Sequence, residues 1–260
     1  MSSHIPEDRP TLRDVTGGIA ALGPFFAVGI HPPDATPVQP WRPLLDLVEQ
    51  PGLMMTRIDA VRAALAAGRP VQRIEHKVAA SVTHLGLVAR LISPALAFVV
   101  TTGHLPCRDL SRVWWQDQLG GAFPLSIPDI TGAALSHQPI DTAKDAALLR
   151  EILINDLIRA LTDAVAATVP VSRLVLQGNV ASAINGAATL ISSQRSDLLP
   201  ASRAVADALL HDPELNPTNS PSGKTFRRSS CCLIYRASEV RSASTDATCG
   251  DCILTPSMHS

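Results

Sequence analysis

The sequence predicts a mainly α-helical body that carries a small antiparallel β element and a C-terminal cysteine-rich extension. Of the 260 residues, 46% are hydrophobic but only 3% are aromatic. Ala, Leu, Val and Ile must therefore fill the core, and these residues suit helix-on-helix packing. The extension is indicated by the tail, where four of the five cysteines gather in the pattern C-C-x16-C-x2-C.

The N-terminal half predicts two short helices separated by a loop. Thr11 is placed to cap a helix that begins at Leu12, with apolar residues at helical spacing up to Leu22. Six prolines between positions 31 and 51 predict a loop without regular structure. A second helix is predicted to open between Thr56 and Asp59 and to end at Gly68.

A long amphipathic helix follows, because apolar residues recur every three or four positions from Val71 to Val88. We expect it to stop at Ser93, which would cap a new helix that has Pro94 in its first position and runs to about Gly103. Two extended runs around the Gly120-Gly121 pair predict a hairpin or two edge strands.

Helices are predicted again at about 143–168, 173–192 and 200–210. The following stretch, "HDPELNPTNSPSGKTF", is rich in Pro, Asn, Ser and Gly and is typical of a linker. The predicted organisation is therefore a helical body over residues 1–210, a linker over 211–226 and a cysteine-bearing segment over 227–260.

Charge and hydropathy narrow the class of protein. A formal net charge of −1 gives no electrostatic reason to expect a nucleic-acid partner. The first ten residues lack the basic and apolar regions of a signal peptide, and the most apolar window, 85–100, is interrupted by Arg90, Ser93 and Pro94. We therefore expect a cytoplasmic protein without a membrane span.

The clustered cysteines predict a metal site, since a reducing compartment disfavours structural disulfides. Four cysteine sulfurs are what a [2Fe–2S] cluster or a structural zinc ion requires. The adjacent pair Cys231-Cys232 fits poorly with the knuckle-like turns of zinc sites, so it favours iron–sulfur without excluding zinc. The chain has no dinucleotide-binding fingerprint, so electrons would have to come from a partner.

The stretch "FRRSSCCLIYR…CGDCIL" resembles the C-terminal signature of the FhuF-type ferric iron reductases, which act on siderophore iron. "HLGLVARLISPALA" and "GNVASAINGA" also resemble helical segments of that family. The resemblance implies a [2Fe–2S] cluster held by Cys231, Cys232, Cys249 and Cys252, which reduces ferric siderophores by one electron. The 16-residue spacer between the two cysteine pairs is longer than the family's, so we expect an extended surface loop there.

The type and position of other residues in the sequence predict roles near such a centre. Arg227, Arg228 and Arg236 are predicted to offset the cluster's charge and to attract an anionic ferric siderophore or an acidic donor such as a ferredoxin or flavodoxin. Asn179 and Asn185 lie inside a predicted helix, where Asn is unfavourable, so they are candidates for hydrogen bonds to substrate.

Two further interpretations of the tail remain open from the sequence. In one, a zinc ion staples the tail of a binding or assembly protein; in the other, the cluster serves a carrier or sensor without reductase activity. The fifth cysteine, Cys107, is interpreted as a buried bystander, and His76 and His84 as packing or hydrogen-bonding residues on the long helix.

Overall fold

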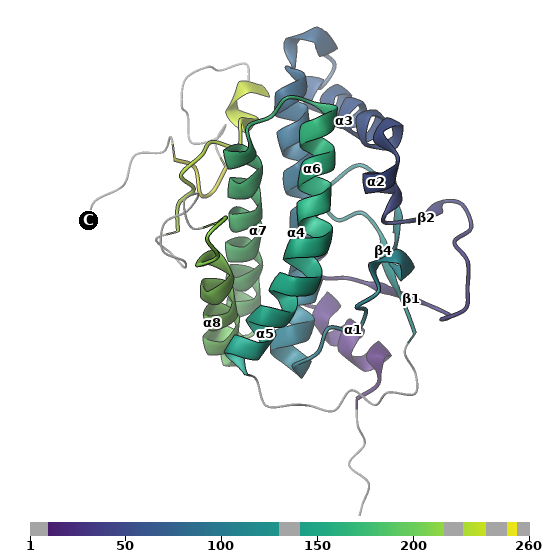
Figure 1. The fold of residues 1–260 in the computed structure, drawn as a ribbon, viewed down its shortest axis with the longest axis vertical. Helices are drawn as coiled ribbons and strands as arrows, with labels where there is room; N and C mark the ends of the chain where they lie inside the picture. The colour runs from purple at the N-terminus through teal and green to yellow at the C-terminus, as the bar shows by residue number, and fades with distance from the viewer. Residues whose placement is uncertain (1–9, 130–140, 216–225, 238–248, 254–260) are drawn as a thin grey trace, which may run out of the picture.

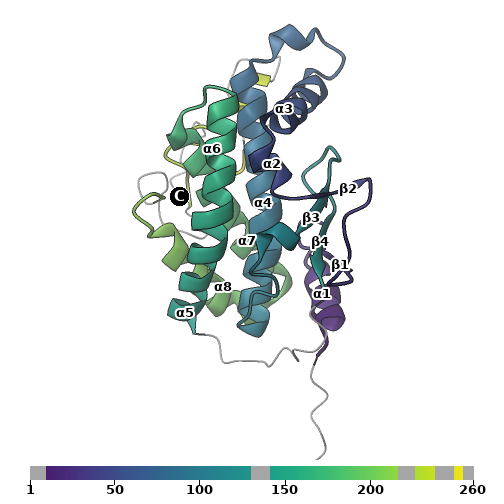
Figure 2. The ribbon, with the colours of Figure 1, turned by 45° about the vertical axis from the view of Figure 1, so that its right-hand side comes forward.

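The structure is a computed structural model that describes residues 10–129, 141–215, 226–237 and 249–253. The chain is mainly helical, as predicted, with a small four-stranded sheet. The long helix α4 (His76–Thr102) runs through the centre, with the sheet and α1 on one side of it and the cysteine-bearing segment on the other (Figures 1 and 2).

Helix α4 is continuous, so the predicted break at Ser93-Pro94 is wrong. Pro94 lies inside the helix and is buried, and the Ser93 hydroxyl donates to the Ala89 carbonyl at 2.7 Å. Residues 91–100 are buried on every side of the helix. Ending the helix there would leave backbone polar groups without partners in an apolar interior, so packing outweighs the local cost of the proline.

The first two helices begin and end for local reasons. Helix α1 (Leu12–Ala20) is capped by Thr11, as predicted, in a reciprocal capping box with Asp14. Helix α3 (Pro51–Ala66) begins earlier than predicted, because Pro51 occupies its first turn, where no N–H is needed. It ends, as expected, just before Gly68, which has a positive φ of 84°.

The predicted hairpin is confirmed, but it belongs to a larger, mixed sheet. β3 (Trp114–Gln116) pairs antiparallel with β4 (Leu125–Pro128), and the strand order is β1-β4-β3-β2. β1 (Gly29–His31) pairs parallel with β4, and β2 (Trp41–Pro43) pairs antiparallel with β3. The prediction of no regular structure over 31–51 was therefore wrong: β2 is an edge strand, where proline is tolerated, and the short helix α2 (Asp46–Glu49) follows it.

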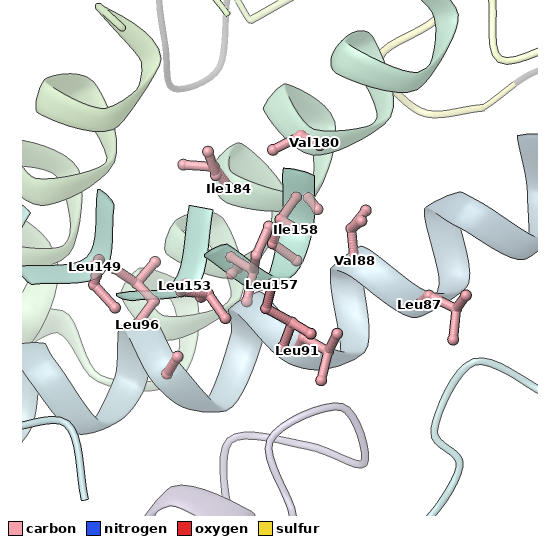
Figure 3. Packing of buried hydrophobic residues seen from close by; sticks show 14 of the residues in the cluster. Leu87, Val88, Leu91, Leu96, Leu149, Leu153, Leu157, Ile158, Val180 and Ile184 are labelled. Carbon is pink, nitrogen blue, oxygen red and sulfur yellow. The ribbon is translucent and has the colours of Figure 1, made fainter. Parts of the chain in front are cut away.

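The C-terminal half is helical, as predicted. α5 (Thr142–Leu148), the π-helical segment η3 (Leu149–Ile158) and α6 (Arg159–Thr168) form one continuous rod, followed by α7 (Arg173–Gln194) and α8 (Leu199–Leu210). Leucine, isoleucine and valine side chains from α4, η3 and α7 fill the space between these helices (Figure 3). The core is aliphatic, as the composition predicted.

Most of the predicted linker and the spacer between the cysteine pairs lie outside the described residues. The described part of the tail includes the short helix η7 (Ile234–Ala237). Ala237 packs with Ala66, Ile74 and Val78 in a small apolar cluster of its own, which anchors η7 against the N-terminal end of α4.

Candidate metal centre

Hydrogen bonds attach the segment that carries Cys231 and Cys232 to the N-terminal parts of α4 and α7. The Ser230 hydroxyl donates to the Leu174 carbonyl at 2.8 Å, and the Ser81 hydroxyl donates to the Cys232 carbonyl at 2.8 Å. The second cysteine pair is brought to the same place by a backbone hydrogen bond of 3.2 Å from the Arg228 N–H to the Asp251 carbonyl.

One thiol from each pair meets at this point. The sulfurs of Cys232 and Cys249 are 3.4 Å apart, although the residues are 17 positions apart in the sequence. Two thiolates on one tetrahedral ion, with metal–sulfur bonds of about 2.3 Å, would be about 3.8 Å apart. Cys249 and Cys252 belong to a turn closed by the Cys252 N–H and the Cys249 carbonyl at 3.1 Å.

The four sulfurs do not surround one point. Within the described ranges, no group of three or more His, Cys, Asp or Glu side chains is placed to hold a single metal ion. All four cysteines are free thiols. Burial raises the pKa of Cys231, and the charges of Cys232 and Cys252 add to that rise. The tail thus gathers four thiols in one neighbourhood, with the closest contact between the pairs.

The contact between Cys232 and Cys249 shifts the pKa values of the two thiols in opposite directions. The hydrogen bond with Cys249 lowers the pKa of Cys232 to about 6, helped by the N–H of Ile234 and the positive charge of Arg228. The same hydrogen bond raises the pKa of Cys249, and the negative charge of Asp251 adds to that rise. Of these two thiols, Cys232 is therefore the one that ionises first, and a thiol must ionise to bind a metal.

Arg228 is the feature of this region that most clearly indicates a bound anionic group. Its side chain is buried, with 1% of the residue exposed. Nη2 donates to the Val175 carbonyl at 3.1 Å and to Asn179 Oδ1 at 2.6 Å, but Nε and Nη1 have no hydrogen-bond partner among the residues that the structure describes. Buried guanidinium N–H groups are costly to leave unpaired. An anionic metal–thiolate centre beside Cys232 would supply acceptors for them, so the residues present fit such a group.

A network of buried polar side chains, which begins at Asn179, supports the position of Arg228. The Asn179 amide nitrogen donates to the Ser81 carbonyl at 3.0 Å and lies 3.4 Å from His84 Nδ1. His84 Nε2 is 2.9 Å from the Thr162 hydroxyl, which itself donates to the Ile158 carbonyl. The Thr162 oxygen therefore accepts from His84, which is the neutral Nε2–H tautomer.

The small residue Gly178 makes this arrangement possible. A Cβ at position 178 would lie 2.3 Å from the Ser230 hydroxyl oxygen and 3.0 Å from Arg228 Nη2. The glycine on α7 therefore admits the cysteine-bearing segment. Leu233, directly after the cysteine pair, has a positive φ of 68°, which turns the chain towards η7.

The residues predicted from the sequence to dock a substrate or donor fall into two groups. Asn179 and Arg228 are buried, and their contacts are internal. Arg236 is exposed and pairs with Glu75 at 3.0 Å, Arg227 is half-buried, and the half-buried Asn185 accepts from Arg203 Nη1 at 2.9 Å.

Two supporting residues, Ser81 and Thr162, were missed, because a single hydroxyl on an apolar helix face carries no distinctive sequence signal. Cys107 is buried, and its thiol donates to the Asp109 carbonyl at 3.1 Å, in keeping with a bystander role. Burial raises the pKa of Cys107 to about 11. No family model and no curated protein matches this chain.

Proposed function

We propose that this protein is an iron–sulfur oxidoreductase that reduces ferric iron in siderophore complexes by one electron and so releases ferrous iron. The observation that carries the proposal is the buried Arg228: its Nε and Nη1 have no described partner, and its positive charge acts on Cys232, whose sulfur meets that of Cys249 from the other half of the C-C-x16-C-x2-C pattern. The resemblance of this tail to the FhuF-type signature supplies the substrate class.

Cys231, Cys232, Cys249 and Cys252 would hold the [2Fe–2S] cluster. When bound, the cluster supplies a site that accepts and donates one electron at a time. One electron is sufficient for the reaction, because ferric iron is held by hard oxygen donors whereas ferrous iron binds them far less tightly.

With a cluster bound, the residues of the chain would have distinct roles. Arg228, fixed by Val175 and Asn179, holds a positive charge next to the cysteines and favours whichever state carries more negative charge. The half-buried Tyr235 and the exposed Arg236 lie three and four positions after Cys232, on η7. They are the described side chains best placed to meet an anionic ferric siderophore or an acidic donor such as a ferredoxin or flavodoxin.

Anaerobic purification followed by iron and sulfide analysis tests the cofactor. We expect two irons and two sulfides per chain, a red-brown colour that bleaches on reduction, and a paramagnetic signal from the reduced state. Each of the four cysteines changed to Ser should weaken or abolish these signals, whereas Cys107→Ser should leave them intact. A colourless protein with one zinc would contradict the proposal and favour the structural staple.

Stopped-flow mixing of the reduced protein with ferric siderophores tests the activity. We expect the visible bands to return as ferrous iron appears, which a ferrous-specific chelator would trap. The same mixing with gallium-loaded siderophores is the control, because gallium(III) does not accept the electron. A cluster that stays reduced with every ferric complex would identify a carrier or sensor instead.

A further inference from the structure

A second candidate site lies on the opposite side of α4 from the cysteines. It is a cleft of about 570 Å³ between α1, the chain leading into β1, the edge strand β2 and the chain leading into β4. Figures 1 and 2 show α1 and the strands on this side, away from the cysteine-bearing segment. Its volume falls in the range of small-molecule sites.

Helix geometry explains why the two sites are separate. Ser81, which contacts the Cys232 carbonyl, and Arg90, which lines the cleft, are nine residues apart on α4. Nine residues are about two and a half turns of an α-helix, so the two side chains leave the helix on opposite faces.

Arg90 reaches the cleft as a buried cation that has no acidic partner among the described residues. Only 1% of the residue is exposed. Nε donates to the Phe123 carbonyl and Nη1 to the Phe25 carbonyl, both at 2.8 Å, and Nη2 donates to the Ala27 carbonyl. These bonds use three of the five N–H donors of a guanidinium. They tie the chain before β1 and β4 to α4, but they add no negative charge.

Burial lowers the pKa of Arg90 to about 10, and no neighbouring charge contributes to that shift. The side chain is therefore still cationic at neutral pH. The described lining of the cleft contains a second cation, Arg13, and contains no Asp or Glu. Arg13 is largely exposed, and within the described residues it forms a long salt bridge of 3.8 Å to Asp129. The charge of the cleft is thus positive and only weakly compensated.

The other residues that line the cleft indicate what kind of molecule would fit beside the two arginines. Trp41 on β2 offers an aromatic surface, and small or aliphatic residues line most of the rest. A guanidinium at the floor, a second at the rim and an aromatic wall are complementary to a carboxylate on a flat or apolar body.

We infer that this cleft binds a small organic carboxylate, with the carboxylate on Arg90 and Arg13 and the apolar body against Trp41. The inference is independent of the cysteine centre, because it rests on residues on the other face of α4. A carboxylate here would neutralise a buried charge and use the guanidinium donors that the carbonyls leave over.

Calorimetric titration of the full-length protein with benzoate and with benzamide tests the inference. The two probes have nearly the same shape, but only benzoate carries a charge. We expect benzoate to bind at least about tenfold more tightly than benzamide, because it alone forms charge-assisted hydrogen bonds. Equal affinities for the two probes, or no measurable heat of binding at about 10 mM benzoate, would overturn the inference.

Variants at the rim locate the binding and avoid a folding defect at Arg90. Arg13→Gln should weaken benzoate binding about threefold to tenfold, and Trp41→Leu should weaken both probes. Arg42→Gln is the matched control, because Arg42 neighbours Trp41 on β2 but does not line the cleft. A benzoate affinity that falls with Arg42→Gln but not with Arg13→Gln would place the carboxylate elsewhere and contradict the assignment.

Discussion

At the scale of single residues, the tail is organised by Arg228. It contacts α7 through the Val175 carbonyl, the buried network through Asn179, and the second cysteine pair through its backbone N–H. Its Nε and Nη1 atoms have no described partner, and this is the observation on which the proposed anionic group beside Cys232 depends.

Arg228→Met should lower the midpoint potential of the bound centre, because a positive charge that stabilises the reduced state is removed. For a one-electron couple about 1.4 kcal/mol corresponds to 59 mV, so we expect a fall on the order of 60 mV. Redox titration followed by visible absorption measures it. Arg228→Lys, which keeps the charge, and Arg236→Gln, which removes an exposed one, should both shift the potential less. A potential unchanged in Arg228→Met would show that the guanidinium does not face the centre.

His84 makes the stability of the protein depend on pH. Burial lowers the pKa of His84 to about 3, with a further contribution from the positive charge of Arg228. The unfolded chain, with a pKa near 6.5, therefore binds a proton that the folded chain refuses between these values. The stabilisation is complete above pH 6.5 and is lost as the pH falls towards 3.

We expect the free energy of unfolding to drop by about 2 kcal/mol between pH 7 and pH 5 from this residue alone. Denaturant unfolding at a series of pH values measures the slope. His84→Gln should flatten it even if the variant is less stable at pH 7. A slope unaffected by His84→Gln would mean that another group titrates.

At the scale of elements, α7 has two glycines with opposite surroundings. Gly178 has the cysteine-bearing segment against it, whereas a Cβ at Gly186 would meet nothing within 4 Å. Both positions lie inside a helix, where alanine is favoured over glycine by about 0.5–1 kcal/mol. An alanine at Gly186 therefore tests the stability of the helix alone, whereas an alanine at Gly178 also tests the packing of the cysteine-bearing segment.

Gly186→Ala should raise the free energy of unfolding by about 0.5–1 kcal/mol and leave the cofactor content unchanged. Gly178→Ala should give the helix the same gain but push Ser230 and Arg228 away from α7. We expect that variant to retain its helical circular dichroism while losing bound iron or weakening its retention under a chelator. Full iron content in Gly178→Ala would show that the segment can move without harm to the site.

At the scale of the whole molecule, the helical body and the cysteine centre depend on different parts of the core. The main apolar cluster is built almost entirely from residues 12–215, with Phe226 as its only described contribution from the tail. α4 and α7 are long and apolar enough to cross a bilayer, but 78% and 56% of their most apolar windows are buried within the fold. The core therefore covers most of the apolar window of α4 and just over half of that of α7.

Loss of the bound centre should therefore leave the body folded. In the Cys249→Ser variant we expect nearly unchanged far-ultraviolet circular dichroism and a cooperative thermal transition within a few degrees of the parent protein. Cys107→Ser is the control for a cysteine change within the body. A non-cooperative melt in Cys249→Ser, with loss of helical signal, would show instead that the centre organises the entire fold.

Much of the fold followed from local patterns. The aliphatic, aromatic-poor composition predicted a helical body, Thr11 predicted the start of α1, and the Gly120 region predicted the β3–β4 hairpin. Two predictions failed for a common reason: the break at Pro94, and a loop without regular structure over 31–51. Local propensity costs a few kcal/mol at most, and burial of α4 and pairing along the sheet edge outweigh it.

The site divides in the same way. The type and spacing of the four cysteines can be read from the sequence, and they are sufficient to predict a metal site. The folded chain was needed to find that Arg228 is buried with donors that no described residue pairs, that Cys232 meets Cys249, and that Gly178 leaves space for the cysteine-bearing segment. Arg228 contacts Asn179 about 50 positions away, and Ser81 contacts Cys232 about 150 positions away. Contacts between residues so far apart leave no periodic pattern in a single sequence.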